Sequence, residues 1–153
     1  MSTPATRLQM DAQRTTLTAE PAAALAVEIG YASVAEKFFR HDPPTPGELE
    51  SAIDAVEDAL MASRARRVEA GALVISADIQ RRLPGLLPAG MTTIEQVEAR
   101  FQRLASASLG HPGALADGPL SPEVAAALLI LRECMHHLGF AHVMIDPAPE
   151  GAP

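Results

Sequence analysis

The turn after the first predicted helix places an imidazole next to a carboxylate. His41 and Asp42 precede Pro43 and Pro44, whose rings restrict the backbone. A histidine on a rigid turn beside an acid is a candidate for proton transfer, so His41 and Asp42 are the predicted catalytic residues. Side chains adjacent in sequence rarely pair as a catalytic dyad requires. A plain elbow between two helices explains the same residues.

A second group of candidates lies near the C-terminus. Cys134 and His137 are three residues apart on one face of a predicted helix, and His142 lies on the strand predicted after it. Thiolate and imidazole bind zinc and copper, so these three are the predicted metal ligands. Their spacing matches no standard zinc motif, and a lone thiol in an apolar helix is also typical of a buried, inert cysteine. The cofactor therefore stays unknown.

Four acidic residues share one side of the second predicted helix: Glu50, Asp54, Glu57 and Asp58. Carboxylates on one helix face can bind a divalent cation or act as general acid and base. A solvated polar face gives the same spacing, and we prefer this interpretation because ligands from elsewhere would also be needed.

Polar residues also follow a short apolar run at positions 72–75. Ser76 and Asp78 could be catalytic at the end of a strand, but they suit the start of a short helix better. Five arginines flank this run and could bind phosphate or carboxylate, namely Arg64, Arg66, Arg67, Arg81 and Arg82. They could equally balance the acidic residues of the chain.

The sequence lacks the motifs that would identify a type of reaction. The sequence contains no G-x-x-x-x-G-K-[ST], G-x-G-x-x-G, G-x-S-x-G or H-E-x-x-H pattern. Exopolyphosphatases and other actin-like phosphatases carry Asp-Gly-Gly-Ser-type phosphate loops, and these are missing as well. The motifs therefore assign no family.

Length and composition predict one small globular domain. The chain has 153 residues, 48% hydrophobic and 20% charged, with net charge −7, so we expect a single domain over 1–153 with flexible tails at 1–5 and 146–153. The acidic charge argues against binding to nucleic acid and to anionic membranes. A single cysteine excludes an internal disulfide. Because no signal peptide or membrane-spanning run is visible, we expect a cytoplasmic protein.

The elements that must position these residues are mainly helical. Helices are predicted at 20–40, from an N-cap at Thr45 to Gly71, from an N-cap at Thr92 to about Leu109, and from Ser121 to Leu138. Runs 72–75 and 140–145 predict strands, and alternation over 7–17 allows an edge strand. The expected fold is α+β and helix-rich, with about four main helices on a two- or three-stranded sheet. An all-α bundle is the alternative.

The first and fourth predicted helices are more apolar than a lone small domain needs. Residues 124–131 are apolar on every side, which is typical of a central core helix or of a subunit interface. We therefore expect a small bacterial-type protein that self-associates as a homodimer, acting as a non-catalytic interaction or assembly domain. The alternative is a small hydrolase- or phosphatase-like enzyme, or a metal-binding protein, that uses the candidate residues above.

Overall fold

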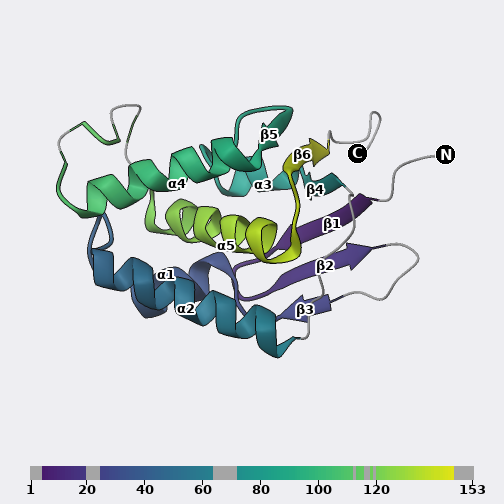
Figure 1. Ribbon diagram of the computed structural model, residues 1–153, viewed down its shortest axis with the longest axis horizontal. Coiled ribbons are helices and arrows are strands. Elements are labelled where there is room, and N and C mark those ends of the chain that lie inside the picture. The colour runs from purple at the N-terminus through teal and green to yellow at the C-terminus, as the bar shows by residue number, and fades with distance from the viewer. Residues whose placement is uncertain are drawn as a thin grey trace.

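The computed structural model describes residues 5–19, 25–63, 72–111, 113–115, 118 and 120–146. Within these ranges the chain forms six strands and five helices (Figure 1). The strands are β1 (Ala5–Met10), β2 (Thr15–Ala19), β3 (Leu25–Val27), β4 (Ala72–Ser76), β5 (Met91–Thr93) and β6 (His142–Asp146). The helices are α1 (Tyr31–Phe38), α2 (Pro46–Ala62), α3 (Asp78–Arg82), α4 (Ile94–Ser108) and α5 (Pro122–Leu138).

The six strands form one mixed sheet in the order β3-β2-β1-β4-β6-β5. A hairpin joins β1 to β2, and β3 continues this antiparallel half. β4 runs parallel to β1 and to β6, so β1, β4 and β6 form a parallel centre, and β5 closes the sheet antiparallel to β6. Side chains alternate along β1: Leu8 and Met10 are buried, whereas Arg7 and Gln9 are exposed.

The predicted small sheet is wrong, and so is the all-helical alternative. The window 7–17, interpreted as one edge strand, contains most of β1, a turn and the start of β2, and β1 is paired on both sides. β3 lies inside the segment expected to be the first half of a helix. β3 and β5 have three residues each, too few to show a hydrophobic period, so their pairing partners define them. The mixture of helix and strand was predicted correctly.

Helix α5 occupies the centre of the helical layer. It lies between α4 on one side and α1 and α2 on the other, and it contacts all three (Figure 1). Residues 124–131 are at most 4% exposed. This helix is apolar on every side because its own chain surrounds it. Its composition therefore needs no second subunit as an explanation.

The helix boundaries follow the capping residues closely. Thr45 and Glu48 form the expected capping box of α2, and Ser121 caps α5. Gly139 ends α5 with φ 83°, a left-handed conformation that glycine adopts without strain. The N-cap of α4 is Thr93, one residue after the predicted Thr92. The predicted end of the second helix at Gly71 lies outside the described residues.

The expected tails fall mainly outside the described ranges as well. Of the segments 1–5 and 146–153, only Ala5 and Asp146 are described, and they are the first residue of β1 and the last of β6. Within the described parts of the chain, no helix has the length and apolar character needed to cross a membrane.

Candidate functional site

The carboxyl ends of β1 and β4 lie side by side and are followed by acidic residues. Leu8 of β1 pairs with Ile75 of β4, so Asp11 and Asp78 follow at the same end of the sheet. Ligands of open α/β sheets commonly bind at the carboxyl ends of parallel strands. A ligand site is therefore expected at this end of the sheet.

Arg82 connects the two strand ends. Its Nε lies 3.1 Å from Oδ2 of Asp78, and its Nη1 lies 3.4 Å from Oδ1 of Asp11. Its Nη2 donates to the carbonyl oxygen of Met10 at 3.4 Å. Because a guanidinium has five N–H donors, these three contacts do not use all of them. The Arg82 side chain is 40% exposed, so it can also contact a ligand from outside.

The start of α3 fixes Asp78. The backbone N–H of Asp78 donates to the Ser76 hydroxyl at 3.3 Å, and Arg81 binds the Asp78 carboxylate at 2.9 Å. The short helix was predicted here, but its N-cap is Ala77, and no side chain caps it in the way expected of Ser76 or Asp78. Arg81 and Arg82, which lie on the last turn of α3, hold Asp78 between them.

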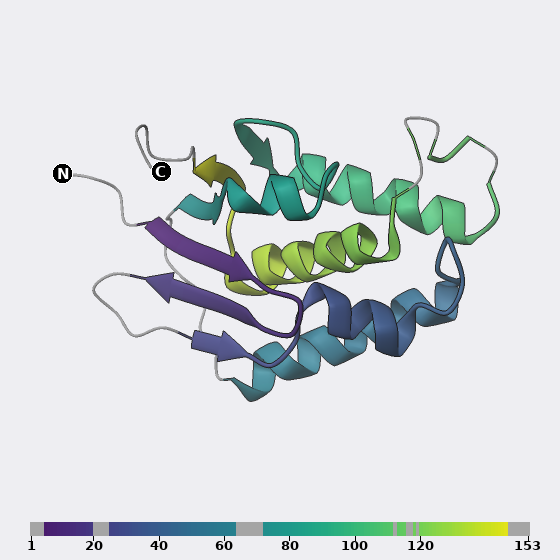
Figure 2. The same ribbon diagram turned by 180° about the vertical axis from the view of Figure 1, so that it is seen from behind.

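The hairpin that carries Asp11 is anchored by helix α1. The N–H groups of Ala32 and Ser33 both donate to the carbonyl oxygen of Ala12 at 3.0 Å, and Tyr31 donates to that of Asp11 at 3.3 Å. Figure 2 shows the hairpin turn beside the beginning of α1. A side chain at Gly30 would not fit, because its Cβ would lie 2.5 Å from the Ala12 carbonyl. The hairpin contains no glycine, so it is not a glycine-rich phosphate loop.

Two pockets meet at Arg82. The smaller has a volume of about 70 Å³ and lies at the strand ends. It is lined by Leu8, Gln9, Met10, Asp11, Ile75, Ser76, Asp78, Ile79 and Arg82. The larger has a volume of about 600 Å³ and lies between the segment 83–88, α4 and the start of α5. Arg82 belongs to both linings, so the pockets are neighbours.

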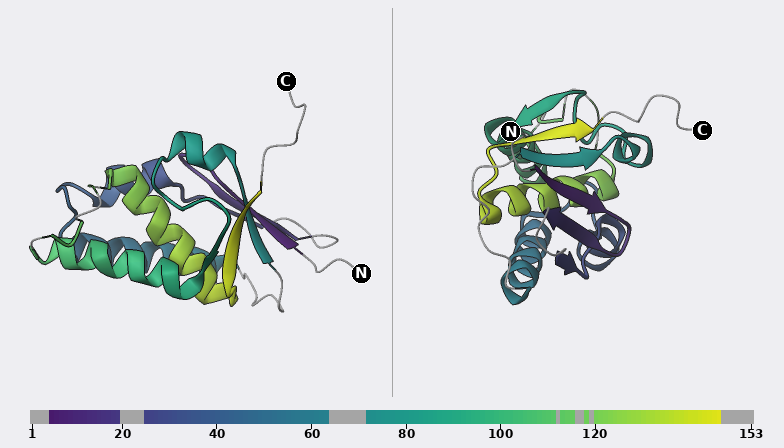
Figure 3. Two further views of the ribbon diagram at one scale, coloured as in Figure 1. Left: turned by 90° about the horizontal axis from the view of Figure 1, so that it is seen from above. Right: turned by 90° about the vertical axis from the view of Figure 1, so that its right-hand side faces the viewer.

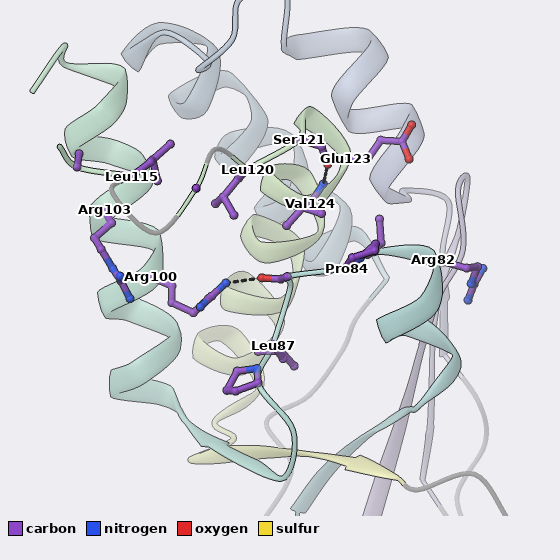
Figure 4. A pocket seen from close by; sticks show the side chains of 15 residues that line it. Arg82, Pro84, Leu87, Arg100, Arg103, Leu115, Leu120, Ser121, Glu123 and Val124 are labelled. Atoms are coloured by element: carbon purple, nitrogen blue, oxygen red, sulfur yellow. Dashed lines mark hydrogen bonds between the residues drawn. The ribbon is translucent and has the colours of Figure 1, made fainter. Parts of the chain in front are cut away.

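The larger pocket combines apolar walls with arginines (Figure 4). Arg100 and Arg103 reach it from α4, while Arg82 lies at the opposite rim with its guanidinium turned toward the strand ends. Leu120 and Val124 lie between the two sides. Its lining includes three arginines and one glutamate, Glu123, in a chain of net charge −7. An anionic ligand with an apolar part would complement such a surface.

The predicted catalytic pair lies elsewhere. His41 and Asp42 are exposed on the elbow before α2, and His41 Nδ1 lies 3.0 Å from Oε2 of Glu48. Glu48 also accepts hydrogen bonds from the N–H groups of Arg40 and Thr45, at 3.0 and 2.9 Å. The hydrogen bonds from His41 and from the Thr45 backbone lower the pKa of Glu48 to about 2. Glu48 thus stabilises the elbow.

The predicted metal ligands are not assembled into a site. Cys134 is buried, and burial raises the pKa of its thiol to about 12, which disfavours the thiolate that a metal requires. His137 and His142 are only partly buried. Across the described ranges, no three His, Cys, Asp or Glu side chains come together in a way that could hold a metal ion.

Some of the other candidate residues lie on the protein surface, and one lies at the candidate site. The four carboxylates of the second predicted helix, Glu50, Asp54, Glu57 and Asp58, are exposed on α2. Arg64, Arg66 and Arg67 lie outside the described residues. Arg82, in contrast, lines both pockets at the end of the sheet. Asp11 was missed because the window 7–17 was interpreted as one strand, although Asp11 directly follows an alternating run and such residues favour turns.

Comparison with known proteins shows a similarity of fold only. No family model matches the chain, and no curated protein sequence does so significantly. Among solved structures, an Aquifex aeolicus PPX-GPPA enzyme is similar with a TM-score of 0.65 and 14% identity, over 95% of this chain and 54% of that one. An exopolyphosphatase-like protein gives 0.63 and 15%, over 88% and 50%. An exopolyphosphatase from Cytophaga hutchinsonii gives 0.52 and 13%, over 94% and 53%.

These similarities change the functional interpretation. The chain spans about half the length of the solved structures that it resembles. Those proteins are described as PPX-GPPA enzymes or phosphatases and as exopolyphosphatases or exopolyphosphatase-like, and this finding overturns the expectation of a non-catalytic assembly domain. That expectation depended partly on the apolar character of α5, which burial within the chain explains.

Proposed function

We propose that this chain is a phosphatase-like domain that binds a phosphorylated ligand where β1 and β4 end, with Arg82 as the cation that contacts the phosphoryl group. The observation that carries the proposal is the position of Arg82, which bridges Asp11 and Asp78 and lines both pockets. The fold shared with exopolyphosphatases supports the same assignment.

Guanidinium groups suit this task. Their planar arrangement of N–H donors matches the oxygens of a phosphoryl group, and they stay charged at every physiological pH. The three arginines of the larger pocket oppose the overall charge of −7, which would otherwise repel an anion. The phosphoryl group would bind near Arg82, and the remainder of the ligand would occupy the pocket beside Leu120 and Val124.

Hydrolysis would use Asp11 as the general base. Asp78 is bound at 2.9 Å by Arg81 and at 3.1 Å by Arg82, whereas the Asp11 carboxylate lies farther from Arg82, at 3.4 Å. Asp11 would accept a proton from water while the water oxygen bonds to phosphorus and the bond from phosphorus to the leaving oxygen breaks. The leaving oxygen would depart with the electron pair of that bond.

Binding is tested with inorganic phosphate, pyrophosphate and tripolyphosphate in isothermal titration calorimetry. We expect Arg82→Gln to weaken binding at least tenfold. Arg14→Gln is the matched control, because Arg14 lies on the same hairpin, pairs with Glu28 at 2.8 Å and lines neither pocket. Failure of all three anions to bind the unchanged protein, or equal binding by Arg82→Gln, would contradict the proposal.

Hydrolysis is tested by phosphate release from pyrophosphate and tripolyphosphate. We expect Asp11→Asn to lose at least a hundredfold in rate with binding retained. Asp54→Asn, on the exposed face of α2, serves as the control and should be unchanged. Binding without hydrolysis by the unchanged protein would disprove the role of Asp11 and leave a phosphate-binding domain.

A further inference from the structure

The larger pocket has positive charges at two opposite places. Arg82, the last residue of α3, lies at one rim, and Arg100 and Arg103 of α4 lie on the other side (Figure 4). Arg100 and Arg103 are three residues apart, so they share one face of α4, which we call the α4 wall. Helices α4 and α5 pack against each other on one side of the sheet, as the left-hand view of Figure 3 shows. The two groups of cations therefore come from different helices, α3 and α4.

The surface between these two groups is apolar. Leu120 and Val124 lie between Arg82 and the α4 wall, and Leu83 and Leu87 line the same pocket from the segment after α3. Leu83, Leu87 and Val124 are at most 6% exposed, so the core holds them in place. Leu120 is partly buried and packs against the same core. A preformed apolar surface of this kind suits an apolar part of a ligand.

The α4 wall is attached to the opposite side of the pocket. Arg100 Nη2 donates to the carbonyl oxygen of Gly85, which connects α4 with the segment 83–88. The Arg103 side chain is exposed, so a ligand can reach it from solvent. Glu123, the acidic residue among the described lining residues, has its carboxylate turned away from the α4 wall (Figure 4). The volume of about 600 Å³ is ordinary for a site that binds a small molecule.

We propose that the ligand of this site is a phosphate monoester whose apolar body carries a second anionic group at its other end. The phosphoryl group contacts Arg82, the apolar body lies on Leu120 and Val124, and the second group, a carboxylate or another phosphoryl group, contacts Arg103. This inference rests on the proposed function, in which Arg82 binds the phosphoryl group. A polyphosphate chain fits less well, because its central charges would lie against side chains that offer no hydrogen-bond donor.

The first test compares phosphonates, whose carbon–phosphorus bond is not broken by the proposed hydrolysis, in isothermal titration calorimetry. Hexylphosphonate has one anionic end, whereas phosphonohexanoate and hexanediphosphonate have two. We expect at least one of the two-ended probes to bind at least tenfold more tightly than hexylphosphonate, and the tighter of them identifies the second group. Arg103→Gln should remove this advantage and leave the affinity for hexylphosphonate unchanged. Arg14→Gln, which removes a positive charge outside both pockets, should keep the advantage.

The results separate this inference from the proposed function. If neither inorganic phosphate nor any phosphonate binds the unchanged protein, the proposed function is wrong, and this inference with it. If hexylphosphonate binds and Arg82→Gln weakens it, the proposed function stands. The inference is then overturned when neither two-ended probe binds more tightly, or when the advantage persists in Arg103→Gln.

A second test does not depend on the Arg103 variant. Hexylphosphonate should bind the unchanged protein at least tenfold more tightly than methylphosphonate, because only its chain reaches the apolar surface. Leu120→Ala should weaken hexylphosphonate at least threefold and leave methylphosphonate unchanged. Leu109→Ala is the matched control, because Leu109 is 66% exposed and lines neither pocket. Equal affinities for the two phosphonates, or tighter binding of tripolyphosphate than of both two-ended probes, would disprove the apolar body.

Discussion

Glu98 of α4 and Arg132 of α5 are joined by two parallel hydrogen bonds. Nε of Arg132 donates to Oε2 of Glu98 at 2.5 Å, and Nη2 donates to Oε1 at 3.1 Å. The same guanidinium lies over the ring of Phe101, 4.3 Å from its centroid. The hydrogen bonds from Arg132 lower the pKa of Glu98 to about 2 despite an opposing effect of burial. This contact ties the central helix to α4.

Loss of the Glu98 carboxylate should destabilise the protein near neutral pH. We expect Glu98→Gln to lower the free energy of unfolding by about 1 kcal/mol, a modest value because the pair is partly exposed. The pKa of Glu98 is lower in the folded protein than the ordinary 4.5, so the contribution is complete above pH 4.5 and is lost as the pH falls toward 2. Urea unfolding at pH 7 and at pH 3 measures this difference.

The exposed residue Glu50 of α2 provides the control for this comparison. Glu50→Gln should leave the free energy of unfolding within about 0.5 kcal/mol of the unchanged protein. A destabilisation by Glu98→Gln that has the same size at both pH values would rule out the ion pair as its cause.

Glu133 should make the protein less stable as the pH rises toward neutrality. Its side chain is 6% exposed, and burial raises its pKa to about 7, with Arg132 opposing and the charges of Glu57 and Glu98 adding to the rise. The folded state therefore retains a proton that the unfolded state loses near pH 4.5. The contribution of Glu133 to the free energy of unfolding is therefore greatest below pH 4.5, falls between 4.5 and 7 by at most about 1.4 kcal/mol per pH unit, and then levels off.

Glu133→Gln tests this expectation because glutamine does not titrate. The free energy of unfolding of the unchanged protein, minus that of the variant, should decrease between pH 5 and pH 7 and stay constant from 7.5 to 9. Denaturant unfolding at closely spaced pH values gives both curves. Parallel curves over the whole range would show that Glu133 does not titrate in this interval.

Local signals in the sequence predicted the longer helices, whereas pairing between distant segments determined the sheet. The capping groups of Thr45 and Ser121 act within four residues of each helix start, so they are visible in one short window. Gly30, expected inside a helix, is the N-cap of α1, because the preceding residues 25–27 pair with β2. That pairing depends on contacts between strands, which a short stretch of sequence read by itself does not reveal.

The candidate site was less predictable than the fold for the same reason. Asp11 and Asp78 are 67 positions apart and come together only because β1 and β4 pair in parallel. His41 and Asp42, in contrast, are adjacent in sequence, and the structure assigns His41 to the support of an elbow through Glu48. The residues of the proposed site therefore come together through strand pairing, which their positions in the sequence do not reveal.

The close approach of Gly30 to the hairpin predicts opposite outcomes for two glycine substitutions. Gly30→Ala should destabilise the protein by about 1–3 kcal/mol, because its Cβ would press against the carbonyl of Ala12. Gly47→Ala is the control: Gly47 lies in the first turn of α2 with no atom within 4 Å of the added Cβ. It should be neutral or stabilise by up to about 1 kcal/mol.

Urea unfolding of the two glycine variants, together with pyrophosphate titration, checks this pair. Because Gly30 supports the hairpin that carries Asp11, Gly30→Ala should also weaken pyrophosphate binding if the proposed site is right. Equal free energies of unfolding for the two variants would show that the hairpin can move away from α1 without loss of stability.

Two neighbouring threonines should respond to the same replacement in opposite directions. Thr92 is 2% exposed in β5, and its hydroxyl oxygen has no hydrogen-bond partner among the described residues. Valine has the same shape without the polar group, so Thr92→Val should stabilise by about 1 kcal/mol. Thr93 instead caps α4, its hydroxyl accepting from the N–H of Gln96 at 3.2 Å. Thr93→Val should therefore destabilise by about 1 kcal/mol. Thermal unfolding of both variants tests this expectation. Shifts of Tm in the same direction would contradict either the absence of a partner for the Thr92 hydroxyl or the capping role of Thr93.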